Sequence, residues 1–147
     1  MGLEDAANNL MLAHYREEYV GSPEMQAAAW VVGLENFKGA LQQGIEGLNN
    51  RLSGLYEIKL SEWHVHLHKA GNNNRFTSLY VNTMSRPGVL RYELFPPSWG
   101  ADFSIARVGR DEYKWHSGDD YLTSEQLAER FLIALLEHTA RFMQGRL

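Results

Sequence analysis

Apolar residues recur at three- and four-residue steps near both ends of the chain, a spacing that predicts amphipathic helices. We expect a first helix over residues 3–19. Ser22 and Pro23 then suit the N-cap and the first helical position, so we expect a second helix over residues 23–52. A last helix is expected to begin at Thr123, because a glutamine three residues later completes a capping box.

Small residues lie beside the apolar stripe of the second predicted helix, at Gly33, Ala40, Gly44 and Gly47. A glycine inside a helix costs roughly 0.5–1 kcal/mol relative to alanine, so several on one side need a reason. We favour close packing against a sheet or a neighbouring helix. A self-association face that makes a homodimer is the alternative.

Between residues 55 and 116 the apolar positions alternate with polar ones, as in strands that bury one face. The alternation changes phase near Ser61–Glu62, and because a one-residue slip turns every side chain over, we predict a β-bulge or a break there. Turn residues separate the segments and no helical pattern intervenes. The fold class is therefore α+β, with two N-terminal helices, a four- or five-stranded antiparallel meander and a C-terminal helix packed on the sheet.

Length and composition narrow the class of protein. The 147 residues are 44% hydrophobic, which fits a single domain over residues 1–147. The chain has no cysteine, which excludes disulfides, thiolate nucleophiles and cysteine-ligated metals. We find no signal-peptide pattern and no apolar run of the roughly 20 residues needed to cross a bilayer, so we expect a soluble, cytoplasmic protein without membrane contact.

The charge balance makes nucleic acid an unfavourable partner. The formal net charge is −4, whereas proteins that bind a phosphate backbone usually present a basic face. Arginines and tyrosines of the sheet region could still stack single-stranded bases, but acidic residues lie among them. The arginines concerned are Arg75, Arg86, Arg91, Arg107 and Arg110.

Three histidines alternate with apolar residues in the segment WHVHLHK, residues 63–69. On a strand, His64, His66 and His68 would project from one face, with roughly 6.5–7 Å between successive Cα atoms. Two neighbours could bind one divalent metal ion if a further ligand came from elsewhere. We name His116 first, and the other suitable donors are Glu93, Glu112, Asp119 and Asp120. The simpler interpretation is the solvated face of an ordinary strand, and it is the one we favour.

A binding surface is the broader hypothesis for the polar face of the predicted sheet. Carboxylates near the histidines would also satisfy the residue types of general acid–base catalysis, but no GxSxG, GxGxxG or GxxxxGK[ST] motif is present, so we assign no catalytic residue. The candidate binding residues are His64, His66, His68, Arg91, Glu93, Trp99, Glu112 and His116.

Trp99 lies in FPPSWGADF, residues 95–103, where two prolines restrict the backbone. Trp99 at the tip of a recognition loop would anchor a partner at a small cost in ordering entropy. The competing interpretation, which we favour here, tucks Trp99 over the sheet edge as a lid on the core.

These observations favour a small, acidic, non-enzymatic binding module that associates with another protein through its sheet face or its loops. Immunity proteins, secretion chaperones and inhibitors illustrate such a role by analogy of size and charge alone. The alternative is a metal- or small-ligand-binding protein, or an enzyme, centred on the histidine-bearing strand. The sequence names neither the partner nor the ligand.

Overall fold

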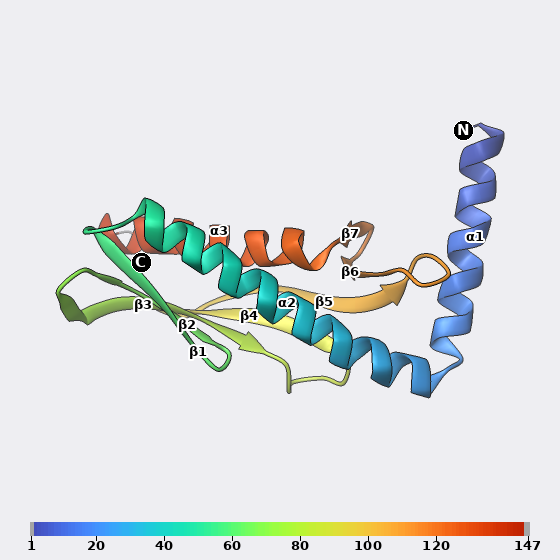
Figure 1. Ribbon diagram of the computed structural model, residues 1–147, viewed down its shortest axis with the longest axis horizontal. Helices are drawn as coiled ribbons and strands as arrows, with labels where there is room; N and C mark the ends of the chain where they lie inside the picture. Colours follow the sequence, from blue (N-terminus) through green and yellow to red (C-terminus); the bar gives the residue numbers. More distant parts are fainter. Residues whose placement is uncertain (1, 146–147) are drawn as a thin grey trace.

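A computed structural model describes residues 2–145 (Figure 1). Three helices and seven strands follow one another as two helices, a run of strands and a closing helix. They are α1 (Leu3–Val20), α2 (Pro23–Arg51), β1 (Tyr56–Ser61), β2 (His64–Lys69), β3 (Asn72–Asn82), β4 (Val89–Phe95), β5 (Ser98–Arg107), β6 (Tyr113–Ser117), β7 (Asp120–Leu122) and α3 (Ser124–Met143).

The strands form one antiparallel sheet in the order β1-β2-β3-β4-β5-β6-β7, so each strand pairs with its neighbours in the chain. Helices α2 and α3 lie side by side over one face of this sheet, and α1 stands at its β5–β6 end, steeply inclined to α2 (Figure 1). The α+β class and the antiparallel meander are thus confirmed. The predicted number of four or five strands is wrong.

The helix starts form as the capping residues predict. The Ser22 hydroxyl accepts a hydrogen bond from the Met25 N–H at 3.2 Å, directly before the proline that opens α2. At α3, the Thr123 hydroxyl accepts from the Gln126 N–H at 3.1 Å, and the Gln126 side chain accepts from the Thr123 N–H at 2.9 Å. Each cap satisfies N–H groups that have no partner inside the helix.

The change of phase near Ser61 marks a turn between two strands. Ser61 pairs with His64, so Glu62 and Trp63 form a two-residue hairpin loop, and Glu62 adopts a positive φ of 55°. Because the turn reverses the chain, the even-numbered apolar positions of β1 and the odd-numbered ones of β2 face the same side. The predicted break is confirmed, and it adds one strand to the expected number.

The core lies between the sheet and the helix pair. Phe37 of α2 meets Phe131 of α3 edge to face, with ring centroids 5.2 Å apart, and both side chains are fully buried. Trp115 of β6 packs edge-on against Phe37, and Phe103 of β5 lies against Phe131. Burying one such side chain contributes roughly 1.5–3 kcal/mol, so each of these aromatic residues adds substantially to the stability of the fold.

Two glycines of α2 mark close approaches between elements. A Cβ at Gly33 would overlap the Ile105 side chain of the sheet, and one at Gly44 would overlap the Leu132 side chain of α3. The packing interpretation of the small residues is confirmed at these two positions. Gly47 differs, because a Cβ there would meet nothing within 4 Å.

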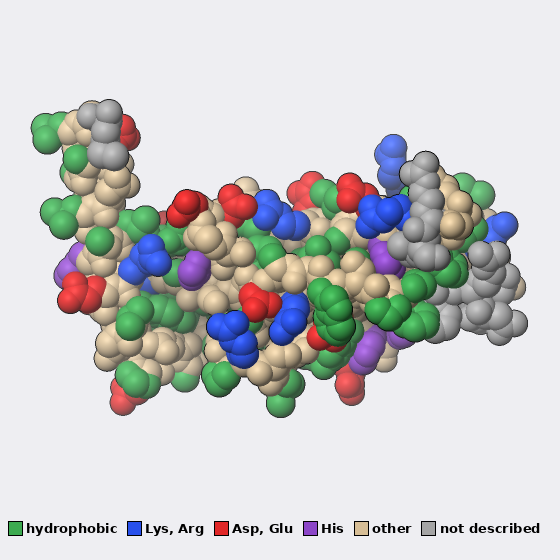
Figure 2. All heavy atoms as spheres, turned by 180° about the vertical axis from the view of Figure 1, so that it is seen from behind, with side chains coloured by type: hydrophobic (Ala, Val, Ile, Leu, Met, Phe, Trp, Pro, Cys, Tyr) green, Lys and Arg blue, Asp and Glu red, His purple; other side chains and the backbone are tan. Residues whose placement is uncertain are grey.

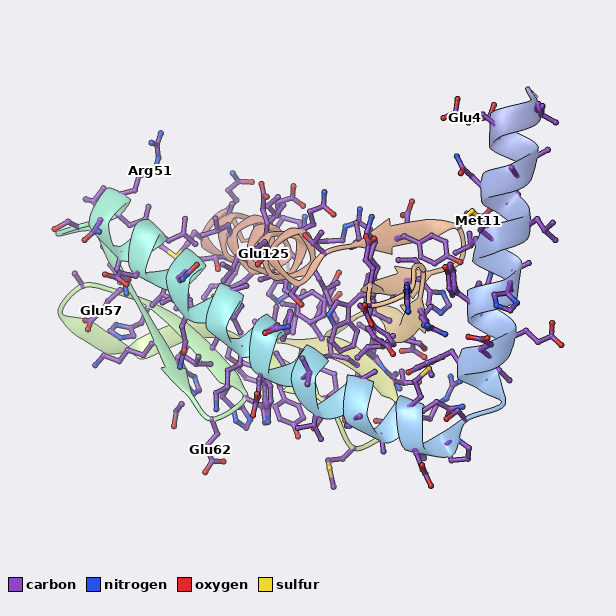
Figure 3. All side chains as sticks on the ribbon, turned by 45° about the vertical axis from the view of Figure 1, so that its right-hand side comes forward. Glu4, Met11, Arg51, Glu57, Glu62 and Glu125 are labelled. Carbon is purple, nitrogen blue, oxygen red and sulfur yellow. The ribbon has the colours of Figure 1, made fainter. Side chains whose placement is uncertain are left out.

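Helix α1 is attached near its C-terminal end. Its first turns stand clear of the other elements, as the position of Glu4 shows (Figure 3). At the other end, Glu18 forms a hydrogen-bonded ion pair with Arg107, whose guanidinium also lies 4.8 Å from the ring centroid of Tyr15. None of the helices within residues 2–145 has the length and apolar content that crossing a membrane requires.

Candidate binding surface on the open face of the sheet

The sheet face turned away from α2 and α3 carries polar and aromatic side chains, and we call it the open face. Strand alternation assigns its members, because their neighbours along each strand enter the core. Across β2 to β6 it includes His64, His66, His68, Ser78, Tyr80, Asn82, Arg91, Glu93, Phe95, Trp99, Asp102, Ser104, Lys114 and His116. Viewed from behind, hydrophobic and histidine side chains share the surface (Figure 2).

The three histidines of β2 project together from the open face, as the alternation predicts, while Val65 and Leu67 are buried on the helix side. His64 and His66 lie with parallel rings and centroids 5.9 Å apart. His68 is buried, and its Nε2 lies 4.0 Å from a carboxylate oxygen of Glu57. The histidine strand is therefore exposed at one end and enclosed at the other.

Cross-strand pairing aligns four side chains across the middle of the open face, and we call them the central row. His64 pairs with Tyr80, Tyr80 with Glu93, and Glu93 with Trp99. The His64 and Tyr80 rings are stacked with centroids 4.5 Å apart. Directly opposed residues have Cβ atoms about 4.5–5.5 Å apart, so a carboxylate lies between two aromatic residues in this row.

Trp99 is not a lid on the core. Its side chain is 66% exposed, and Phe95, at the end of the preceding strand, is 52% exposed. Residues 95–103 form the hairpin between β4 and β5 rather than a long loop, so Trp99 is a strand residue. The pairing of β4 with β5 is irregular between Arg91 and Glu93, a shift that re-aims the residues near Trp99 and has no signal in the alternation pattern.

The Tyr92 ring supports this irregular stretch from the core side, at Gly100. A Cβ at Gly100 would overlap the ring of Tyr92, so that ring lies directly over the glycine backbone. Tyr92 in turn packs edge to face against Phe131, with centroids 4.8 Å apart. The strand that presents Trp99 to solvent therefore rests on an aromatic contact between partly buried Tyr92 and fully buried Phe131.

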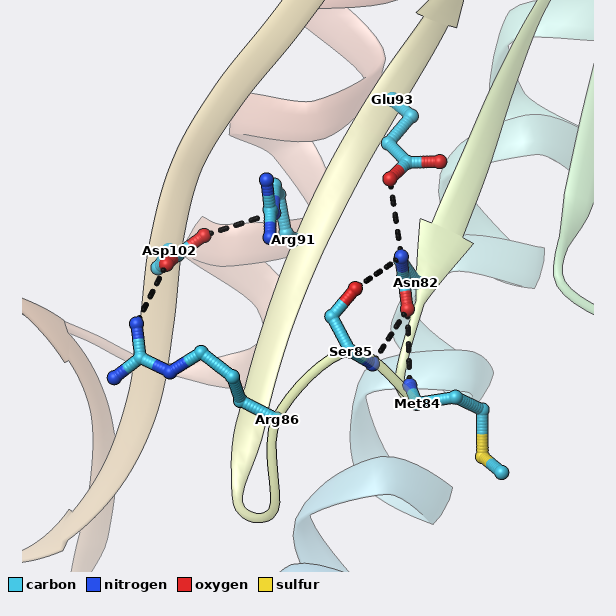
Figure 4. A network of polar contacts seen from close by, with 7 residues as sticks. All are labelled: Asn82, Met84, Ser85, Arg86, Arg91, Glu93 and Asp102. Carbon is cyan, nitrogen blue, oxygen red and sulfur yellow. Dashed lines mark hydrogen bonds and ion pairs between the residues drawn. The ribbon is translucent and has the colours of Figure 1, made fainter.

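A polar network lies beside the central row (Figure 4). The Asn82 amide donates to a Glu93 carboxylate oxygen at 3.0 Å and to the Ser85 hydroxyl at 2.6 Å, while its oxygen accepts from the Met84 and Ser85 N–H groups at 2.9 and 3.0 Å. These bonds fix the Asn82 side chain. It therefore holds the Glu93 carboxylate in place without neutralising its charge.

The two arginines of this network are paired with a different carboxylate. Asp102 forms an ion pair with Arg91 Nε at 3.0 Å and another with Arg86 Nη1 at 3.2 Å (Figure 4). Arg107 is likewise paired, with Glu18 of α1. Three of the five arginines considered for nucleic-acid contact thus have carboxylate partners, and the Arg75 side chain lies outside the described residues.

The structure does not bring the proposed metal ligands together. Strands β3, β4 and β5 separate His116 on β6 from His64 and His66 on β2. At about 4.7–4.9 Å per strand, this separation is about 19 Å, far beyond the reach of a shared ion. Among the residues that the structure describes, no three metal-binding side chains form a cluster. Alternation along each strand correctly placed His64, His66 and His116 on one face of the sheet. Alternation cannot give the distance between strands, however.

His116 and Glu112 occupy the β6 end of the sheet. The His116 ring stacks on Tyr121 with centroids 5.4 Å apart. Burial, followed by the positive charge of Arg16, lowers the pKa of His116, and a hydrogen bond with the Gly118 main chain opposes the shift. Glu112 precedes β6 and lies 3.7 Å from the Lys114 ammonium, so it does not contribute to the central row.

The pKa of His66 is also lowered. Burial is the largest cause, and the neighbouring His64 and His68 add to it, because two positive charges side by side disfavour each other. The lowered pKa favours the neutral form of the His66 imidazole, in the middle of the histidine strand.

Comparison with known proteins adds no relative. No protein-family model matches the chain, and no curated protein or solved structure matches it either. The class that the structure defines is an α+β fold with one uncovered, aromatic sheet face.

Several residues of the candidate surface were absent from the sequence-based set. Tyr80, Asn82 and Phe95 share the face of Glu93, and Asp102 pairs with Arg91. Odd–even alternation along a predicted strand shows which residues share a face of the sheet. The pairing of residues on neighbouring strands depends in addition on the lengths of the turns. The two-residue loops after Ser61 and Phe95 were the missing signal.

Proposed function

We propose that the protein is a non-enzymatic binding module that associates with a partner protein through the open face of its sheet. The observation that carries the proposal is the exposure of Trp99 and Phe95 beside the stacked rings of His64 and Tyr80. Large exposed aromatics on a rigid scaffold are typical anchors of protein interfaces, because they bury a large area and lose little conformational entropy. The association would act by masking the partner's surface.

Charge supports the same proposal. The chain carries a net charge of −4, which would steer it toward a basic surface and raise the rate of encounter at low salt. The open face itself mixes aromatic, imidazole and carboxylate groups. Such a composition suits a polar, partly wet interface better than an obligate apolar one.

Catalysis and metal binding receive less support from the geometry. On the open face, the closest imidazole–carboxylate ion pair among the described residues joins His68 and Glu57 at 4.0 Å, which exceeds hydrogen-bond distance. His64 and His66 offer two metal donors, and no cluster of three metal-binding side chains forms in the described part of the chain. Metal analysis of protein purified without a tag or a chelator tests this alternative directly, and stoichiometric metal lost in a His66→Ala variant would favour it over our proposal.

The binding proposal is tested by capture from a lysate of the source cells with immobilised protein. We expect a specific partner to be retained by the wild type and by a Gln42→Ala control on α2. The double variant Phe95→Ser/Trp99→Ser should lose that partner while keeping its circular dichroism spectrum. A partner retained equally by all three proteins would contradict binding through the open face, and so would the absence of any partner.

A further inference from the structure

The Glu93 carboxylate has an environment that a cation would complete. Its described polar contact is the neutral Asn82 amide, and within the described residues no cationic side chain forms an ion pair with it. Arg91, two residues along the same strand, is directed to Asp102. A negative charge is therefore held in a fixed position on the surface without a compensating positive charge.

Aromatic residues flank this carboxylate on both neighbouring strands. Tyr80 is opposite Glu93 on β3, and Trp99 is opposite Glu93 on β5. The faces of aromatic rings attract cations, with about 0.5–1 kcal/mol at exposed sites and more where water is displaced. Trp99 is 66% exposed, and tryptophan is the aromatic residue that attracts cations most strongly.

A guanidinium group satisfies both features at once. It is planar, so it can stack on an indole or phenol ring, and its N–H groups lie in the same plane and can donate to a carboxylate beside that ring. A lysine ammonium is a compact, strongly hydrated charge that cannot stack. The Asn82 bond occupies one oxygen of Glu93 at 3.0 Å and leaves the other oxygen to accept.

We infer that the central row binds an arginine side chain of a partner protein, with its guanidinium on Glu93 between Tyr80 and Trp99. This inference rests on the proposed function, because it names the chemistry that the partner must present. The bound arginine side chain would then be the main contact of the interface, and it would lie at the irregular β4–β5 pairing, where Trp99 projects.

The test uses short blocked peptides and the intact protein. Acetyl-Gly-Arg-Gly-amide is titrated while the Trp99 indole N–H resonance is followed by NMR, with that resonance assigned by its loss in Trp99→Phe. The peptide with citrulline in place of arginine has a side chain of the same shape without the charge. The peptide with lysine keeps the positive charge but lacks the planar guanidinium group. We expect the arginine peptide to bind saturably, and both controls to bind at least about fivefold more weakly.

Two variants locate the site. Glu93→Gln keeps the shape of the side chain but removes its charge, and we expect about tenfold weaker binding of the arginine peptide, as for the loss of one charged hydrogen bond. Glu4→Gln removes an exposed carboxylate on the distant end of α1 and should leave binding unchanged (Figure 3). Equal binding of the citrulline peptide, equal binding of the lysine peptide, or an unaffected Glu93→Gln variant would each overturn the inference.

The outcome separates this inference from the proposed function. A partner that is lost with Phe95→Ser/Trp99→Ser but not with Glu93→Gln, together with no peptide binding, would overturn the arginine site and leave the open-face interface standing. Peptide binding that depends on Glu93, in a protein whose partner is unaffected by the double variant, would support the arginine site and contradict the interface.

Discussion

Helices α1 and α3 are similar in length, with 18 and 20 residues, but their contacts differ completely. Seven residues of α3 are buried, whereas α1 has none. Both segments have apolar residues at helical spacing, and both were predicted as helices on that ground. The pattern therefore predicts the element in each case, but it does not show whether the chain itself covers the apolar stripe.

The attachment of α1 explains how a helix can be ordered without a buried side chain. Arg107 is almost fully buried and donates to the Arg110 carbonyl through Nε at 3.2 Å and Nη2 at 2.7 Å, in addition to its ion pair with Glu18. Tyr19 of α1 packs edge to face on Tyr113, with centroids 5.9 Å apart. Polar and aromatic contacts at one end replace the apolar interface that holds α3.

The largest expected effect comes from the core contact of α3. Phe131→Ala removes a fully buried ring that touches Phe37, Tyr92 and Phe103, so we expect the free energy of unfolding to fall by about 3–5 kcal/mol. Urea denaturation followed by circular dichroism measures this. A loss below 1 kcal/mol would show that α3 does not hold the core.

Arg107→Ala should release α1 while leaving the rest of the fold in place. The variant loses an ion pair, two hydrogen bonds to a carbonyl and the cation–π contact with Tyr15, and we expect the attachment of α1 to weaken by about 1.5–3 kcal/mol. Hydrogen exchange with mass spectrometry should show faster exchange in α1 and unchanged protection in α3.

Two controls define the role of Arg107. Arg107→Lys keeps the charge but lacks the planar fork that reaches Arg110, so its exchange in α1 should be intermediate. Lys114→Ala, on the neighbouring strand, removes a cation paired with Glu112 and should leave α1 protected. Uniformly faster exchange over α1 and α3 in Arg107→Ala would contradict independent attachment.

His138 of α3 should make stability depend on pH. It is 1% exposed, and burial lowers its pKa; the nearby Arg141 lowers it further, while the main chain of Pro96 and Phe95 opposes the shift. A lowered pKa means that the unfolded chain binds the proton more readily, so stability is present above the ordinary histidine value of about 6.5 and falls as the pH drops below it.

A matched pair of α3 variants isolates this effect. His138→Leu should flatten the fall in unfolding free energy between pH 7 and 5, although His66 and His116, whose pKa values are also lowered, retain a part of it. Leu135→Val, one turn away, should reduce stability by about 1 kcal/mol at every pH and keep the slope. An unchanged slope in His138→Leu would refute the assignment.

The helices and most of the strands could be predicted from patterns of residues that are close in the sequence. The caps at Ser22 and Thr123 set the helix starts, and alternation placed His64, His66 and His68 on one face. These features depend on residues close in sequence, where backbone geometry fixes the period. They could therefore be predicted from the sequence alone.

Relations between strands could not be predicted in the same way. The separation of His116 from the β2 histidines depends on the order of the strands, and the exposure of Trp99 depends on an irregular pairing with β4. The short strand at residues 120–122 was absent from the prediction because three residues give no measurable period. Register and strand order are long-range properties, and the candidate site is built from both.

The smallest expected effect tests the uncovered stripe of α1. Leu10 is 72% exposed, so Leu10→Ser should change the free energy of unfolding by no more than about 0.5 kcal/mol, in contrast to the effect of Phe131→Ala on α3. Unfolding is measured at two protein concentrations tenfold apart, with light scattering on the native protein. A larger loss of unfolding free energy that grows with protein concentration would mean that a second copy covers the apolar stripe, because subunit association makes stability depend on concentration. Helix α1 would then resemble α3, with its apolar partner supplied by another chain.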